Sequence, residues 1–180
     1  MLAAATTSLP ETPGGERNWD YRFSWIRDST FALWSMHSLG FEQEARDFMR
    51  FVRDRALESN DAGIQIMYGI GGEHDLTEHL LDHLSGYGGA KPVRTGNGAF
   101  DQRQNDVWGA LLDSIYVHRR AIGPEAINDQ TRKLVKDLVE NALEAWPKPD
   151  QGIWEARGEP QHYVSSKLMC WVAVDRGQRL

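Results

Sequence analysis

Apolar residues recur at steps of three and four along five segments of this chain, and that spacing gathers them on one face of an α-helix. The first segment is dense in apolar residues and is expected to form a largely buried helix that stops at Gly40. No segment alternates apolar and polar residues as a strand would, so the predicted class is all-α. The helices are expected at about residues 25–39, 41–56, 103–119, 127–146 and from an N-cap at Ser165 or Ser166 onward.

A glycine-rich excursion over residues 59–98 separates the second helix from the third. It contains the short apolar run GIQIMYGIGG, flanked by turn residues, and then a brief predicted helix over residues 76–83. On such a helix His79 and His83 would share a face and could bind zinc, although Asp82 replaces the glutamate of the corresponding hydrolase signature. A solvated helix face is the alternative interpretation of this motif.

Composition excludes several classes of protein. A chain of 180 residues with 41% hydrophobic content can bury one sizeable core. The net charge of −6 and the absence of a basic block argue against nucleic acid or an anionic membrane as a partner. No apolar run approaches the ~20 residues of a membrane span, and the start lacks a secretion signal, so a cytoplasmic location is expected. Cys170 is the single cysteine and is expected to be a buried thiol without a redox role.

The order of the helices predicts where polar chemistry gathers. If consecutive helices are antiparallel, the first, third and fifth point the same way, and their N-terminal ends lie at one pole. The segments at those ends are YRFSWIRD, GNGAFDQRQND and GIWEARGEPQHY, each rich in groups that bind ligands or transfer protons. The segments before the second and fourth helices look like ordinary turns and caps. Helix N-termini also offer unpaired N–H groups, so we expect the functional site at this pole.

Four stretches carry a family resemblance: NWDYRFSWIRDSTFALW, QIMYGIGGE, GNGAFDQRQNDVWG and GIWEARGEPQHYVSSKLMCWVAVDRG. Together they resemble glycoside hydrolase family fifteen, the glucoamylases, and in detail its bacterial trehalase branch more than its fungal branch. The resemblance implies a barrel of twelve helices in two rings, an (α/α)6 barrel, with the active site at the N-terminal ends of the inner helices. Residues 1–24 would be an extended loop segment, and residues 25–180 would supply about five helices of the barrel, joined by long loops.

The resemblance also implies a reaction and its residues. The family hydrolyses α-glucosidic bonds with inversion, using one carboxylate as acid and another as base. Glu155 corresponds to the general acid, while Arg27 and Asp28 correspond to residues that grip hydroxyls of the terminal glucose. The remaining substrate-binding residues expected from the motifs, some of them by weaker correspondence, are Tyr21, Trp25, Tyr68, Gln104, Asp106 and Trp154.

Trehalose is the expected substrate. The mechanism needs no cofactor, although some bacterial trehalases of this branch depend on phosphate and magnesium. The family places its catalytic base far downstream, so the chain is expected to end before the base and to be impaired in hydrolysis; Glu73 and Asp106 are replacements without a sequence basis. An open helix array would expose apolar edges, so self-association is also expected.

Most of these residues have a structural alternative. Glu155 could be a loop carboxylate, Arg27 and Asp28 an ion pair in a first turn, and the two tryptophans at 25 and 154 part of the core. Gln104 and Asp106 could cap the third helix. The alternative functions are a glucoamylase acting on an α-linked glucan, a noncatalytic sugar-binding fragment, and a zinc hydrolase centred on His79 and His83.

Overall fold

The computed structural model describes residues 1–58 and 64–180 and divides the chain into two compact units. One unit holds residues 1–25 and 67–101, and the other holds residues 26–66 and 102–180. Residues 59–63, where the predicted excursion begins, lie outside the described residues. Within the described part of the chain the fold is mostly helical, which confirms the all-α class and agrees with part of an (α/α)6 barrel.

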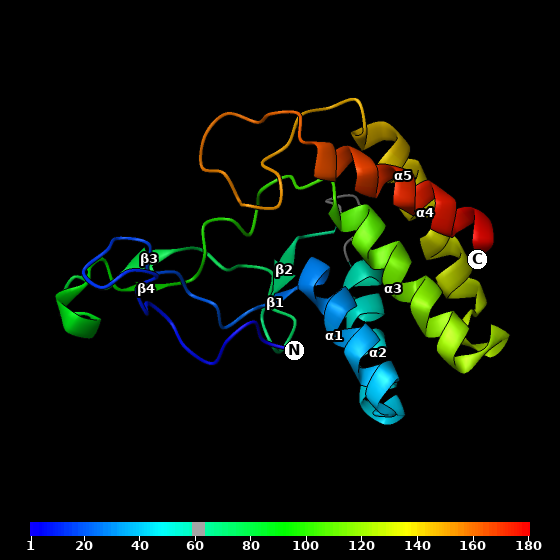
Figure 1. The fold of residues 1–180 in the computed structure, drawn as a ribbon, viewed down its shortest axis with the longest axis horizontal. Helices are drawn as coiled ribbons and strands as arrows, with labels where there is room; N and C mark the ends of the chain where they lie inside the picture. Colours follow the sequence, from blue (N-terminus) through cyan, green and yellow to red (C-terminus); the bar gives the residue numbers. More distant parts are fainter. Residues whose placement is uncertain (59–63) are drawn as a thin grey trace. The chain divides into compact units, whose positions relative to one another are not determined.

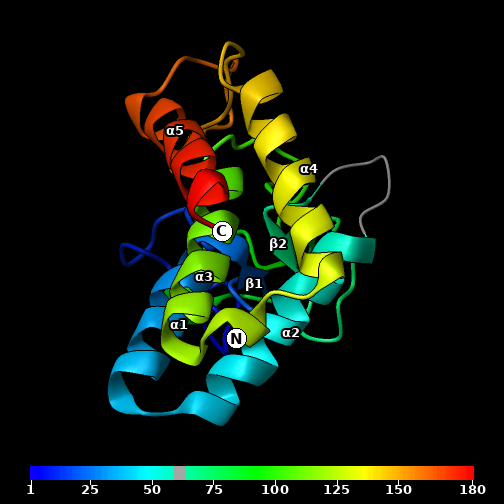
Figure 2. The same ribbon diagram turned by 90° about the vertical axis from the view of Figure 1, so that its right-hand side faces the viewer.

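The second unit is a layered array of helices (Figure 1). Neighbouring helices alternate in direction: α1, α3 and α5 run the same way, and α2 and α4 run opposite to them. Figure 2 shows α3 between the α1–α2 pair and the α4–α5 pair, so α3 forms the centre of the unit. The elements are α1 (Ile26–Leu39), α2 (Glu42–Glu58), α3 (Val107–Ile122), the short 3-10 helix η2 (Pro124–Ala126), α4 (Asp129–Ala145) and α5 (Val164–Arg179).

Local sequence signals explain most of these helices. Gly40 follows α1 with a φ of 81°, the left-handed conformation that ends helices, as predicted. The side chain of Asn128 accepts the N–H of Thr131 and thereby caps α4. Most of the apolar stripe predicted for the second helix is buried as expected, through Ala45, Phe48, Met49, Val52 and Ala56. Phe41, predicted as its first member, precedes α2 and is exposed. No helix in the described residues is both long enough and apolar enough to span a membrane.

The contact between α3 and α5 depends on a glycine. A Cβ atom at Gly109 would lie 2.2 Å from the backbone oxygen of Met169, well inside van der Waals contact. The two backbones therefore approach more closely than any other residue at this position would allow. This close packing brings the first turns of α3 and α5 together, which matters for the site below.

The first unit is built from loops tied by two short antiparallel sheets. One pairs β1 (Ser24–Trp25) with β2 (Met67–Tyr68), and β2 lies in the predicted apolar run. The other pairs β3 (His79–Leu80) with β4 (Arg94–Thr95), near the 3-10 helix η1 (Tyr87–Gly89). Buried Asp20 accepts the N–H of Gly96 and two bonds from the Arg22 guanidinium, so a fully buried carboxylate organises these loops.

The predicted helix over residues 76–83 is wrong. Thr77 donates both its N–H and its hydroxyl to the carboxylate of Asp75, a local bond that competes with helix formation. Leu80 then pairs with Arg94 in the β3–β4 sheet. His79 and His83 therefore share no helix face, which removes the basis for the zinc hydrolase. Among residues 1–58 and 64–180, no cluster of three or more His, Cys, Asp or Glu side chains could hold a metal ion.

Two further expectations are corrected. The first helix is not largely buried, because Phe31, Trp34 and Leu39 are 66%, 49% and 71% exposed. The fifth helix begins at Val164, so Ser165 and Ser166 lie inside its first turn rather than at the N-cap. The hydroxyl of Ser166 donates instead to the buried carboxylate of Asp150.

Candidate functional site

The N-terminal ends of α1, α3 and α5 lie at one end of the helical unit, as predicted (Figure 1). Arg27, the second residue of α1, contacts Asp106, which directly precedes α3. The same guanidinium lies 3.9 Å from the carboxylate of Glu155, on the loop that leads into α5. We call this end of the unit the N-terminal pole. One cation therefore connects segments from three parts of the sequence.

The guanidinium of Arg27 is held by several oxygen atoms. Its Nη1 atom donates to Gln104 Oε1 at 3.1 Å and to Asp106 Oδ2 at 3.3 Å. Its Nε atom lies 3.9 Å from the carboxylate of Asp28, which is itself 59% exposed. Because the Arg27 side chain is only 22% exposed and is held from several sides, its position is fixed by the fold. The planar fork still has an edge directed at Glu155.

Asp106 is a buried counter-ion rather than a helix cap. Its side chain is 2% exposed and makes no capping hydrogen bond at the start of α3, so the capping alternative is wrong for this residue. Burial raises the pKa of its carboxyl group, while the charge of Arg27 and the hydrogen bond to it act in the opposite direction. Within the described residues, Oδ1 of Asp106 has no hydrogen-bond partner. The carboxylate is therefore placed to orient Arg27.

Glu155 lies on a loop closed at its base by paired backbones. Asp150 and Gln161 exchange two backbone hydrogen bonds of 2.9 and 2.8 Å, so residues 151–160 project as one loop. Gly152 has a φ of 66°, and a Cβ atom there would lie 2.7 Å from the ring of Tyr163. Glu155 itself has a φ of 54°, which is uncommon for a residue with a side chain. The surrounding structure therefore dictates the conformation at Glu155.

The side chains on this loop are accessible to a ligand. Glu155 is 23% exposed, so its carboxylate meets solvent while remaining next to Arg27. Trp154 is 84% exposed, and the alternative that it belongs to the core is wrong. An exposed indole beside a half-buried carboxylate is typical of a surface that can stack against a sugar ring.

Asp150 anchors the loop to two helices. Its side chain is fully buried, and Oδ2 accepts the backbone N–H of Asn105 and the hydroxyl of Ser166, each at 2.7 Å. Asn105 precedes α3 and Ser166 lies in the first turn of α5, so one carboxylate joins both helix starts. Cys170 of α5 is also buried as predicted, and burial raises the pKa of its thiol to about 11.

Sequence interpretation missed Asp150 and Gln102. Asp150 belongs to PKPDQG, which was interpreted only as a helix stop, and Gln102 lies within the polar segment before α3. The Nε2 atom of Gln102 donates to the carbonyls of Glu155 and Ala156 at 3.4 and 3.2 Å. Neither position carried a sequence signal, since an Asp or a Gln in a loop predicts neither burial nor a contact with another segment.

Three predicted residues belong to the other compact unit and lie close to one another there. Trp25 is 5% exposed in β1, and the ring of Tyr21 lies 6.0 Å from its ring. Tyr68, on the partner strand β2, is fully buried with its ring edge-on to His74. The core alternative therefore fits Trp25. Glu73, in the same unit, accepts the N–H of Gly71.

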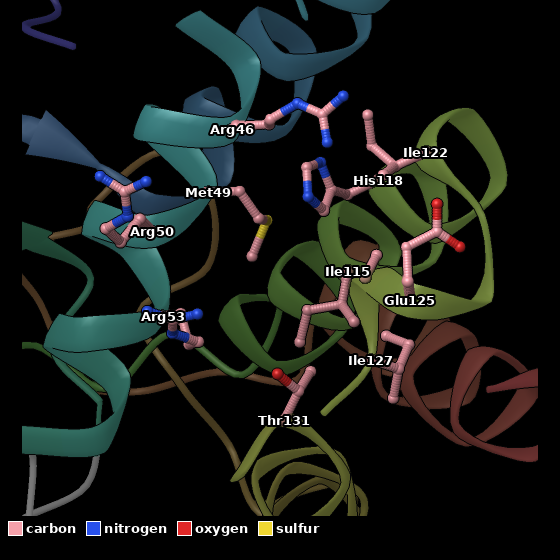
Figure 3. A pocket seen from close by; sticks show the side chains of 11 residues that line it. Arg46, Met49, Arg50, Arg53, Ile115, His118, Ile122, Glu125, Ile127 and Thr131 are labelled. Atoms are coloured by element: carbon pink, nitrogen blue, oxygen red, sulfur yellow. The ribbon is translucent and has the colours of Figure 1, made fainter. Parts of the chain in front are cut away.

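Each unit contains a cavity, and neither of these two cavities is lined by Arg27 or Glu155. In the helical unit a cavity of about 220 Å³ is lined by α2, α3, the η2 turn and α4 (Figure 3). Figure 3 shows Arg46 beside His118 at its rim and Met49 directed into it. A cavity of about 520 Å³ in the other unit is lined by Arg22, Glu73, Asp75 and His79, among others.

Comparison with known proteins now decides the family. Residues 1–180 match the model of the glycosyl hydrolases family 15 over the whole chain. The chain belongs to this family. No solved structure matches this family 15 chain.

Several curated relatives carry the name trehalase. The chain is 57% identical to the trehalase of Mycolicibacterium smegmatis and 56% identical to that of Mycobacterium tuberculosis, in both cases over 100% of its length. It is 41% identical over 97% of its length to the trehalase of Thermoplasma volcanium. It spans only 27%, 26% and 27% of those proteins, so this family 15 chain corresponds to about a quarter of each relative.

Proposed function

We propose that this chain supplies the acid half of an inverting glycoside hydrolase that cleaves trehalose to glucose, with Glu155 as general acid. The observation that carries the proposal is the position of Glu155, half-buried at the N-terminal pole and 3.9 Å from the guanidinium of Arg27. The substrate follows from the relatives named trehalase at 57% and 56% identity. Trehalose is preferred to an α-linked glucan on that ground alone.

The proposed chemistry begins with a proton on Glu155. That proton moves to the glycosidic oxygen as its bond to the anomeric carbon breaks, and one glucose leaves. A water molecule attacks the opposite face of the anomeric carbon and gives its proton to a base. Arg27 then lies beside the Glu155 carboxylate that remains and stabilises its negative charge.

The base is not assigned to a residue of this chain. Asp106 is 2% exposed and bonded to Arg27, so it has little access to the water that a base must activate. Glu73 uses its carboxylate to accept the N–H of Gly71. An inverting enzyme holds its two carboxyl groups about 6.5–9.5 Å apart, which leaves room for that water. A base near Glu155 on the solvent side would meet this requirement.

The same geometry divides the predicted binding residues. We assign sugar contact to Asp28 and Trp154, which are exposed, and place Arg27 between the sugar and its own buried partners. Tyr21 keeps its predicted sugar contact on the ground of its motif alone. Gln104 and Asp106 are engaged with Arg27, so we assign them to orienting it. Trp25 and Tyr68 keep their predicted role as a proposal only, since both side chains are buried.

The proposal is tested by glucose release from trehalose and from maltose. The 180-residue chain is assayed alone and after it replaces the matching 182 residues of the Mycolicibacterium smegmatis trehalase. Glu155→Gln should lower kcat about a hundredfold or more, because general acid catalysis contributes about 10²–10⁴-fold. Glu159→Gln, an exposed carboxylate on the same loop, is the matched control and should leave kcat unchanged.

The outcomes separate the alternatives. Equal turnover by Glu155→Gln and the parent would refute the acid assignment. Faster release from maltose than from trehalose would favour the glucoamylase alternative, and sugar binding without turnover in the replacement protein would favour the noncatalytic one. Running each assay with and without phosphate and magnesium tests the dependence that the trehalase branch suggests, and none of the described residues is assigned to hold either.

A further inference from the structure

We propose that Gln102 is a positioning residue that fixes the backbone of the general acid relative to Arg27. The inference rests on the proposed function, because it concerns how Glu155 is aimed. Gln102 lies just before α3, whereas Glu155 lies just before α5, so the two segments meet only in the folded chain. The side chain of Gln102 donates to the main-chain carbonyls of Glu155 and Ala156.

Gln102 is one link in a directed chain of side-chain amides. Arg27 Nη1 donates to Gln104 Oε1 at 3.1 Å, and Gln104 Nε2 donates to Gln102 Oε1 at 3.2 Å. Gln102 Nε2 then donates to the carbonyls of Glu155 at 3.4 Å and Ala156 at 3.2 Å. Each amide accepts on one side and donates on the other, so the guanidinium that faces the Glu155 carboxylate is also connected to the Glu155 backbone.

The loop needs such a connection because its own bonds do not fix its tip against α3. The N–H groups of Glu155 and Ala156 donate to Gly152 and Gln151, which belong to the same loop. The paired backbones of Asp150 and Gln161 close the base of the loop. The positive φ of Glu155 is costly for a residue with a side chain, so contacts from outside must favour it. Gln102 provides two of them, at the residue that carries the acid.

The amide is required at position 102, and not merely a polar side chain. A glutamate would place a carboxylate against two carbonyl oxygens and could not donate to them. A methionine has nearly the same length and keeps the packing, but neither donates to the carbonyls nor accepts from Gln104 effectively. Gln102→Met is therefore the test variant. Gln161→Met is the matched control, because the exposed Gln161 side chain lies on the same loop and donates to the carbonyl of Glu159, a bond within the loop.

The first test measures amide hydrogen exchange in the 180-residue chain, which needs no turnover. Gln102→Met should speed exchange at Glu155 and Ala156 by about tenfold, since two bonds that hold this backbone are lost. Exchange in α2 and α4 should stay unchanged, and Gln161→Met should leave the loop tip as it is. Unchanged exchange at the loop tip in Gln102→Met would overturn the proposal, whatever the enzyme does.

The second test is a double-mutant cycle in the replacement protein of the assay above. Gln102→Met should lower kcat for trehalose about tenfold to a hundredfold with little change in KM, because misplacing a catalytic group by about 1 Å can cost that much. In the Glu155→Gln background the same change should have no further effect, because the residue through which Gln102 acts is gone.

The two tests separate this inference from the proposed function. Equal losses from Gln102→Met in both backgrounds would mean general damage to the fold and would overturn the positioning role. If Glu155→Gln keeps full turnover, the acid assignment fails; the exchange result then still decides whether Gln102 holds the loop. Faster exchange at the loop tip, together with a loss of kcat only in proteins that keep Glu155, supports both the acid assignment and the positioning role of Gln102.

Discussion

The two ends of the helical unit hold their charged side chains in different ways. At the N-terminal pole, Arg27 and Asp106 are mostly buried and come from positions 79 residues apart. Toward the far end, in the first half of α2, Arg46 and Arg50 pair with acidic residues four and three positions away on the same helix. Those far-end side chains are 44% to 66% exposed.

This difference separates the proposed functional surface from a solvated one. Burying a charge costs several kcal/mol of desolvation unless attraction to its partners offsets that cost, so a buried pair contributes little to net stability. Exposed pairs on one helix contribute about 0–1 kcal/mol and can be lost without consequence. The N-terminal pole thus holds buried charged side chains, and removing one of them leaves its partner unpaired. The far end holds exposed ion pairs, and removing one of them changes the stability little. A site that must aim a carboxylate requires the first arrangement.

The far end also holds a pair of ionisable side chains that are partly buried. His37 of α1 and His118 of α3 lie with ring nitrogens 3.3 Å apart, next to Arg46. Burial lowers the pKa of both imidazoles. The neighbouring cation Arg46 adds to the effect at both, while the charge of Glu42 opposes it at His37. The stability contributed by this pair can therefore be measured by changing the pH as well as by substitution.

The largest effect is expected at Asp150 of the pole. Asp150→Ala leaves the N–H of Asn105 and the hydroxyl of Ser166 buried without their acceptor, which should lower the free energy of unfolding by about 3 kcal/mol. Asp47→Ala at the far end removes an exposed partner of Arg50 and Gln43 and should cost less than about 0.5 kcal/mol. Urea unfolding of both variants measures the difference. If both variants lowered the free energy of unfolding by similar amounts, the proposed difference between the two ends would be wrong.

A smaller effect is expected when the His37–His118 pair is titrated. The pKa of His118 is lowered from 6.5 to about 4 in the folded chain. A group with a depressed folded pKa contributes stability that is present above its unfolded pKa and is lost as pH falls toward its folded pKa. Unfolding should therefore become easier between about pH 6.5 and 4, by about 2 kcal/mol after allowance for partial exposure.

The control for that titration is a non-ionising side chain. His118→Asn should flatten the loss of stability between pH 6.5 and 4, measured by urea unfolding at several pH values. His162→Asn, which changes an exposed histidine at the base of the Glu155 loop, should leave the parent's pH dependence intact. If the parent chain is equally stable at both pH values, folding does not lower the pKa of His118 and the prediction is wrong.

The sequence predicted the helices well where local spacing determines them. The buried stripe of α2 and the stop of α1 at Gly40 follow from residues adjacent in the chain. Prediction failed where distant bonds compete with local ones. Leu80 pairs with Arg94 instead of continuing a helix, and Ser166 donates to Asp150 instead of capping α5. Bonds of that kind leave no periodic signal in the sequence.

The site was predictable to the same extent. The motifs pointed to Arg27 and Glu155, and the direction of the helices pointed to the pole at which they meet. The residues that hold them were not visible, because Gln102 reaches the Glu155 carbonyl across 53 positions. Burial of Asp106 was equally hidden, since an aspartate before a helix ordinarily indicates a cap.

The smallest of these effects is expected at the far-end start of α4. Asn128 caps this helix by accepting the N–H and the hydroxyl of Thr131, both at 2.9 Å and only three residues away. Asn128→Ala should lower the free energy of unfolding by about 1 kcal/mol, and Asn128→Asp, which keeps an acceptor, should recover most of the loss. Gln130→Ala, an exposed neighbour, is the control and should have no effect in the same urea unfolding. If Asn128→Ala cost as much as Asp150→Ala, local bonds would matter as much as distant ones, and the distinction between the two ends would rest on exposure alone.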